Sequence, residues 1–194
     1  MLEYYGLMPA VYPQRWIGKH DTFSSDEISY GMYVLSSTNS TGDDDADTAR
    51  VLYDFGGFID AGVSEFTVEF EKGTSGAVGW YSCAFKGKDS VVTHTLDVCV
   101  PNSLILNIKD RKIFGAEDIL AENMMIDYME SATKVLCRHD GNKQYSITLM
   151  DDSSTGEVFE TSLVKRNGSH RVLPMVSFTG KVTVSGLKYA IDEL

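Results

Sequence analysis

Residues 65–71, Glu-Phe-Thr-Val-Glu-Phe-Glu, alternate polar and apolar side chains without interruption. Successive side chains of a β-strand point to opposite faces, so Phe66, Val68 and Phe70 are expected to share one face. A strand with one buried and one solvated face is typical of antiparallel sheets. The same period of two recurs to the end of the chain, which predicts a protein built from antiparallel strands.

Turn signals separate the later strand-like runs. Asp140-Gly141 stands between two β-patterned runs, the apolar residues 135–137 and the alternating residues 145–149. Asn167-Gly168 stands in the same way before residues 171–178. Glycine tolerates the positive φ that a tight turn requires, so both dipeptides predict β-hairpins. Residues 91–100 are also expected to form a strand.

The chain is expected to fold as one domain. Its 194 residues suit a single sandwich, and no Pro-, Gly- or Ser-rich linker divides them. Residues 24–194 are assigned to this domain. Residues 1–23 are interpreted as an N-terminal arm, because Pro9 and Pro13 oppose helix formation. The arm would pack across the domain or against a neighbouring subunit.

One short segment departs from the strand pattern. Within residues 116–128, the spacing of Glu117, Asp118, Leu120 and Met124 is compatible with a short helix. The sequence therefore predicts an all-β fold, a two-sheet antiparallel β-sandwich with at most one short helix.

Charge and hydropathy narrow the classes of partner. The net charge of −11 and the pI near 4.7 disfavour nucleic acid and anionic membranes as partners. No run approaches the roughly 20 apolar residues that a membrane span needs, so membrane insertion is not expected. The first ten residues lack the basic and apolar regions of a signal peptide, which predicts cytoplasmic synthesis.

Three cysteines, Cys83, Cys99 and Cys137, have no metal-ligand spacing. Their odd number favours buried, reduced thiols over the disulfide framework of a small secreted protein. A single Cys83–Cys137 or Cys99–Cys137 bridge is the alternative.

Several segments resemble the concanavalin A-like sandwiches of the laminin-G and pentraxin type. The likeness lies in residues 66–70, in Gly79-Trp80-Tyr81, in the Asp140-Gly141-Asn142 turn with Tyr145, and in residues 178–194. It implies a jelly-roll topology. It also implies a function within that superfamily's range, which covers glycan binding, protein contacts and polysaccharide cleavage.

The hydrolase branch of that superfamily carries Glu-x-Asp-x-x-Glu on one strand. The nearest string here is residues 117–122, which places Asp118 directly after Glu117. Neighbouring residues of a strand face opposite sides, so these two carboxylates would not act as a pair. The chain is therefore not expected to be an enzyme of this kind.

Aromatic side chains are the candidate binding residues. Trp80, Tyr81 and Trp16 are candidates for a ligand surface, because aromatic rings stack on the apolar faces of sugars. The competing interpretation places Trp80 in the sandwich core. Tyr4, Tyr5 and Tyr12 are expected at an interface with a partner or a second copy.

An acidic run, Asp43-Asp44-Asp45-Ala46-Asp47, is the candidate metal site. Calcium takes six to eight oxygen ligands, and Asp43, Asp45 and Asp47 could supply several of them. The run lacks the glycine and distal glutamate of an EF-hand loop. A solvated loop of like charges is the competing interpretation.

Two functions follow from these patterns. The first is a non-enzymatic structural or binding module that meets a protein partner or assembles with itself, such as a viral or phage particle component that mediates assembly or receptor attachment. The alternative is a carbohydrate-binding, lectin-like domain, with calcium as the one cofactor considered. A polysaccharide-active enzyme ranks below both.

Overall fold

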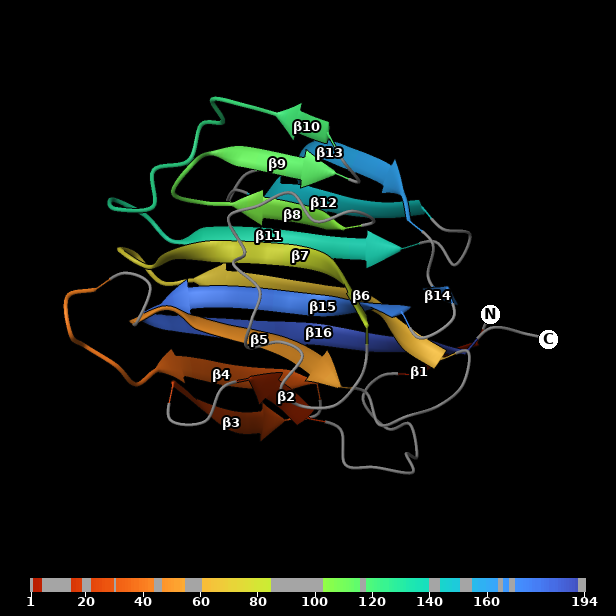
Figure 1. Cartoon of the computed structure of the whole chain (residues 1–194), viewed down its shortest axis with the longest axis horizontal. Helices are drawn as coiled ribbons and strands as arrows, with labels where there is room; N and C mark the ends of the chain where they lie inside the picture. The colour runs from red at the N-terminus through yellow and green to blue at the C-terminus, as the bar shows by residue number, and fades with distance from the viewer. Residues whose placement is uncertain are drawn as a thin grey trace.

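The computed structural model describes residues 2–4, 15–18, 22–29, 31–43, 47–54, 61–84, 103–115, 118–139, 144–150, 155–163, 166–167 and 170–191. These residues form sixteen strands in two antiparallel sheets (Figure 1). Across sheet A the order is β13 (Thr155–Ser162), β12 (Gln144–Met150), β11 (Thr133–His139), β6 (Ala61–Phe70), β16 (Lys181–Ile191), β4 (Met32–Ser37) and β3 (Phe23–Ser29), with β1 (Leu2–Tyr4) also paired to β16.

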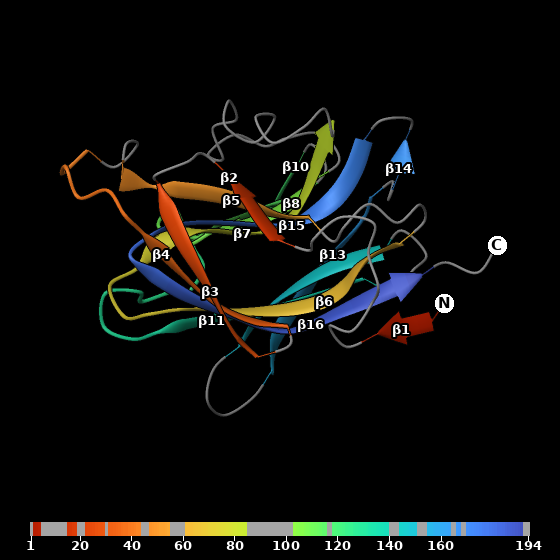
Figure 2. The same cartoon turned by 90° about the horizontal axis from the view of Figure 1, so that it is seen from below.

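Across sheet B the order is β10 (Asp118–Ala121), β9 (Lys112–Gly115), β8 (Leu104–Asn107), β7 (Ser75–Ala84), β15 (His170–Thr179), β5 (Ala49–Asp54) and β2 (Arg15–Gly18), with β14 (Arg166–Asn167) also paired to β15. Figure 2 shows the two sheets as stacked layers. The predicted two-sheet antiparallel sandwich is confirmed.

The alternation in residues 65–71 places β6 in the middle of sheet A. Phe66, Val68 and Phe70 are fully buried, whereas Glu69 is exposed. On the neighbouring strand β11, Val135 pairs with Val68 and is also buried. Directly paired residues point to the same face, so the core face of one strand fixes the core face of the next.

Both predicted hairpins are present. β11 and β12 pair from Lys134↔Met150 to His139↔Tyr145, although the Asp140-Gly141 turn itself lies outside the described residues. β14 and β15 pair through Asn167↔His170. The strand expected at 91–100 also lies outside the described residues.

The chain changes layers at Gly180. β15 ends at Thr179 in sheet B, and β16 begins at Lys181 in sheet A. Gly180 has a φ of +120°, which side-chain-bearing residues rarely adopt. Ser37 of β4 fixes the corner, because its N–H donates to the Gly180 carbonyl at 2.8 Å and its Oγ accepts from the Gly180 N–H at 2.7 Å.

The helix considered for residues 116–128 is not formed by its described residues. Residues 118–121 form β10, which pairs with β9 at the edge of sheet B, and turns follow. Ile119 and Leu120 are exposed, so the helical spacing of Leu120 and Met124 does not define one buried stripe. Pairing with β9 gives the backbone N–H and C=O groups of β10 their hydrogen-bond partners.

The segment expected to form an N-terminal arm contributes strands to both layers. β1 pairs with β16 in sheet A, and β2 pairs with β5 in sheet B. Among the described residues, no helix is long and apolar enough to cross a membrane.

Candidate functional site

Trp80 is a core residue. Its side chain is fully buried between the sheets, where its ring meets Phe66, Tyr145 and His139 at centroid distances of 5.0, 5.1 and 5.4 Å. Its indole N–H donates to the Ser146 carbonyl at 3.4 Å. The ring therefore offers no face to a sugar, and the core interpretation holds.

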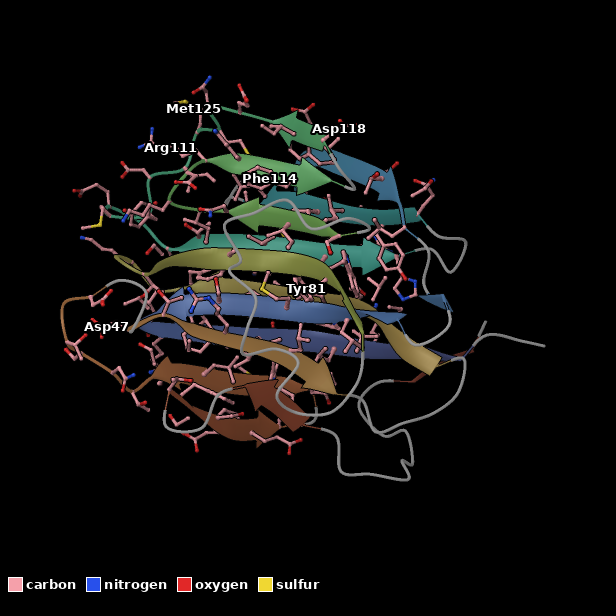
Figure 3. The ribbon with its side chains drawn as sticks, viewed as in Figure 1. Asp47, Tyr81, Arg111, Phe114, Asp118 and Met125 are labelled. Atoms are coloured by element: carbon pink, nitrogen blue, oxygen red, sulfur yellow. The ribbon has the colours of Figure 1, made fainter. Side chains whose placement is uncertain are left out.

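Tyr81 and Trp16 are also placed in the core. Tyr81 is 1% exposed and lies in the middle of sheet B (Figure 3). Trp16 is 6% exposed and packs edge-on against Tyr53, with ring centroids 5.1 Å apart. Aromatic rings supply much of a sandwich core, so none of the three predicted ligand-binding rings is presented at the surface.

Asp47 stabilises its own loop. Its Oδ1 accepts hydrogen bonds from the N–H and the Oγ1 of Thr41, both at 2.8 Å, and its Oδ2 accepts from the Gly42 N–H at 2.8 Å. These bonds hold the pKa of Asp47 below its ordinary value, the Thr41 backbone N–H contributing most. A carboxylate engaged in this way has little capacity left for a cation.

The other acidic residues give no metal centre within the described part of the chain. Asp43 is exposed and Asp45 lies outside the described residues. No cluster of three or more His, Cys, Asp or Glu that could hold a metal is found among the residues that are described. Calcium binding by Asp43, Asp45 and Asp47 stays a prediction.

The remaining predicted positions are placed as follows. Tyr5 and Tyr12 lie outside the described residues, and of Tyr4 only the backbone is described, paired with Tyr189.

Cys137 is a free, buried thiol, so the two alternative disulfides, Cys83–Cys137 and Cys99–Cys137, are not formed. Burial raises the pKa of the Cys137 thiol because the thiolate would be desolvated.

A hollow of about 510 Å³ lies on the outer face of sheet A, and we call it the sheet A hollow. It is lined by residues of β11, β12 and β13: Leu136, Arg138, His139, Gln144, Ser146, Thr148, Val158 and Glu160. Val158 pairs with Thr148, and Thr148 pairs with Leu136, so these three side chains form one row across the face. Thr148 is 5% exposed although it faces outward, because the surface is hollowed at this row.

A second row runs parallel to the first. Glu160 pairs with Ser146, and Ser146 pairs with Arg138. The row continues through Glu65 on β6, whose carboxylate lies 3.5 Å from the Arg138 guanidinium and 2.5 Å from the Lys188 ammonium. The ion pair with Glu65 orients the Arg138 guanidinium. Because the Arg138 side chain is still 63% exposed, it also presents hydrogen-bond donors to the hollow.

The hollow therefore combines two kinds of surface. Leu136 and Val158 give it an aliphatic strip, and Val158 is 51% exposed. Around this strip stand several kinds of hydrogen-bonding group: a guanidinium, a carboxylate, an amide, an imidazole and two hydroxyls. Gln144 is already oriented, because its Nε2 donates to Ser162 Oγ at 2.5 Å.

Sequence reasoning did not single out these residues. Part of the signal was present, because residues 144–149 alternate polar and apolar side chains and therefore assign Gln144, Ser146 and Thr148 to one face. The pairing register that aligns Val158, Thr148 and Leu136 across three strands is not visible in the pattern.

Comparison with known proteins defines the fold class. No family model matches the chain, and no curated protein matches it in sequence. Among solved structures, the chain is similar to a lectin from Bauhinia forficata in complex with GalNAc, with a TM-score of 0.50, 9% identity, and coverage of 97% of this chain and 96% of that one. It is similar to stonustoxin with a TM-score of 0.50, 14% identity, and coverage of 90% of this chain and 26% of that one.

At these identities the comparison shows the fold alone. The chain has a concanavalin A-like, jelly-roll β-sandwich fold, as the sequence resemblance implied. The expectation of a viral or phage particle component gains no support from either structure.

Proposed function

We propose that the chain is a carbohydrate-binding, lectin-like domain and that the sheet A hollow is its binding site. One observation carries the proposal: a hollow on an open sheet face surrounds an aliphatic strip with hydrogen-bonding side chains from three adjacent strands. Its volume of about 510 Å³ falls in the range of small-molecule sites, roughly 300–1,000 Å³. The shared fold with a lectin agrees with this proposal.

The chemistry of the lining matches that of a sugar. Each sugar hydroxyl both donates and accepts hydrogen bonds, so a site for it needs donors and acceptors side by side. Arg138 donates, Glu160 accepts, and Gln144, Ser146 and Thr148 do both. The C–H face of the ring would lie on Leu136 and Val158, which take the place of an aromatic platform.

We propose binding without turnover. Glycoside hydrolysis uses two carboxyl groups roughly 5 to 9 Å apart across the scissile bond. Of the lining residues that the structure describes, Glu160 carries the single carboxylate. The proposed site also draws on no metal, because its described lining offers one carboxylate and one imidazole and not a cluster of three or more such ligands.

A glycan array followed by titration calorimetry tests the proposal. We expect binding of a defined set of neutral glycans, and we expect Glu160→Gln to weaken it about tenfold, since a charge-assisted hydrogen bond contributes roughly 1.5–3 kcal/mol. Asp26→Asn is the matched control. Asp26 is an exposed carboxylate on β3, at the opposite edge of the same sheet.

The two variants give clear opposing outcomes. Equal affinities of Glu160→Gln and Asp26→Asn for the bound glycan would place the site elsewhere. An array without any bound glycan would refute carbohydrate binding itself.

A further inference from the structure

A second hollow, of about 810 Å³, lies where the two sheets end at one side of the sandwich. We call it the edge groove. It lies between the segment that follows β10 and the ends of β11, β12 and β13. In Figure 1, β10 and β13 lie at the same edge of the two layers, and in Figure 3 Met125 lies at that edge.

The groove has an apolar surface that is rich in methionine. Its apolar lining residues are Leu120, Ala121, Met124, Met125, Ile126, Leu149, Met150 and Phe159. Met125 is 95% exposed and Leu120 is 38% exposed. Flexible, polarizable methionine side chains adapt to varied apolar partners, and exposed apolar patches of this kind mark interaction sites.

The charged residues around this surface are mostly acidic. In the described part of the lining there are four carboxylates, those of Glu69, Glu122, Asp127 and Glu157, and all four residues are exposed. Among the described residues of the lining, Lys134 is the single cationic side chain. The groove therefore disfavours fatty acids, anionic headgroups and nucleic acids, and it is complementary to a cationic partner with apolar side chains.

An edge strand borders the groove. Within the described part of the chain, β13 pairs only with β12 and ends sheet A. At Gly156 the strand has no side chain, and a Cβ there would lie 2.2 Å from the Leu149 carbonyl oxygen. The exposed backbone of such an edge can accept an added strand, while its carboxylates discourage pairing with a second copy of the same acidic chain.

We propose that the edge groove binds an extended peptide segment of a partner protein in which Lys or Arg stands two residues away from large apolar residues, so that both kinds of side chain share one face of the added strand. The segment adds as a strand to the free edge of β13. Its apolar side chains enter the groove toward Met124, Leu149 and Phe159, and its cationic side chains reach Glu122 and Glu157.

This surface is separate from the sheet A hollow. Val158 and Glu160 line the hollow, whereas Glu157 and Phe159 line the groove. The side chains of successive β13 residues thus point to opposite faces of the sheet. The peptide site does not depend on carbohydrate binding, and the two activities are measured independently.

Fluorescence anisotropy with synthetic peptides tests the proposal. Three labelled peptides of about eight residues, roughly 27 Å when extended, repeat Lys-Ser-Leu-Ser, Lys-Ser-Ser-Ser or Glu-Ser-Leu-Ser and are called Lys-Leu, Lys-Ser and Glu-Leu after the residues on their groove-facing side. We expect the Lys-Leu peptide to bind and each of the others to bind at least about tenfold more weakly. Equal binding of Lys-Ser would reduce the effect to charge alone and overturn the apolar groove, as would no binding of Lys-Leu.

Charge reversal locates the site. Glu122→Lys combined with Glu157→Lys is expected to weaken the Lys-Leu peptide about tenfold or more. Glu130→Lys is the matched control, because Glu130 is an exposed carboxylate near the same segment that does not line the groove. Equal losses in the double variant and the control would overturn the assignment to this groove.

Two further measurements keep the proposal testable. Met125→Ser changes an almost fully exposed side chain, so the fold is retained, and we expect it to weaken the Lys-Leu peptide several-fold. A Lys-Leu peptide N-methylated at alternate residues lacks the donors that pair with an edge strand. If Met125→Ser binds the Lys-Leu peptide as tightly as the wild type does, apolar docking is overturned. If the N-methylated peptide binds as tightly as the unmodified one, strand addition is overturned.

Discussion

The ring of Trp80 lies edge-on to the ring of Phe66, with centroids 5.0 Å apart and planes at 80°. Trp80 belongs to β7 of sheet B and Phe66 to β6 of sheet A, so this contact joins the two layers. Both side chains are fully buried. The same contact explains why Trp80 is unavailable to a ligand.

Trp80→Ala is expected to lower the free energy of unfolding by about 3–5 kcal/mol, the range for removing a large buried aromatic side chain. Urea denaturation measures the loss. Met125→Ala, at an almost fully exposed position, is expected to stay within about 0.5 kcal/mol of the wild type. Trp80→Phe should fold and keep its glycan affinity, and a selective loss of that affinity would reinstate Trp80 as a ligand residue.

Asp47 makes stability depend on pH in a defined direction. Its pKa in the folded protein lies below the ordinary value of 3.8, so its contribution is complete above that value and is lost as the pH falls through the lower, folded pKa. We therefore expect wild type to exceed Asp47→Asn in urea midpoint at neutral pH. The gap should shrink at pH values below 3.8. A gap that is independent of pH would contradict this role, with Asp26→Asn as the surface control.

Removal of divalent metal is expected to leave glycan binding unchanged, because the described lining of the sheet A hollow holds only one carboxylate and one imidazole, and no cluster of three or more His, Cys, Asp or Glu is found among the described residues. Calorimetry in EDTA and in added calcium makes the comparison. Affinity that disappears in EDTA and returns with calcium would instead favour the acidic run that contains Asp43, Asp45 and Asp47 as a metal site.

Cys137 is expected to resist alkylation in the native protein. Its thiol is fully buried and its pKa is raised, so the reactive thiolate is scarce at a pH of about 8. Iodoacetamide treatment followed by mass spectrometry of the peptide that contains Cys137 should show modification only after unfolding in denaturant. Rapid modification without denaturant would mean that β11 opens locally.

Gly180→Ala is expected to destabilise the corner between the two sheets by about 1–3 kcal/mol, because φ is +120° and the new Cβ would lie 2.6 Å from Thr74 Oγ1. Gly186→Ala serves as the comparison. Gly186 also has a positive φ, +63°, but nothing lies within 4 Å of its Cβ position. We expect the smaller loss there, about 1 kcal/mol, and equal losses would rule out the steric part of the argument.

Local patterns account for much of the fold. The alternation in residues 65–71 assigns Phe66, Val68 and Phe70 to one face of a strand, and all three side chains are buried in the core. The two hairpins follow from Asp140-Gly141 and Asn167-Gly168, since turn geometry depends on adjacent residues. Residues 118–121 are harder to assign, because a short apolar run suits a helix or an edge strand until a partner strand is known.

By itself, the sequence determined the strand period, the turns and the antiparallel sandwich, because these depend on near neighbours in the chain. The tertiary structure alone decided which outward side chains meet. Val158, Thr148 and Leu136 lie on three strands and become one row only through the pairing register. It also placed Trp80 and Tyr81, both candidate ligand residues, among the buried side chains, because the pattern of a strand does not show what covers each of its faces; Trp80, for example, packs on Phe66 of the opposite sheet.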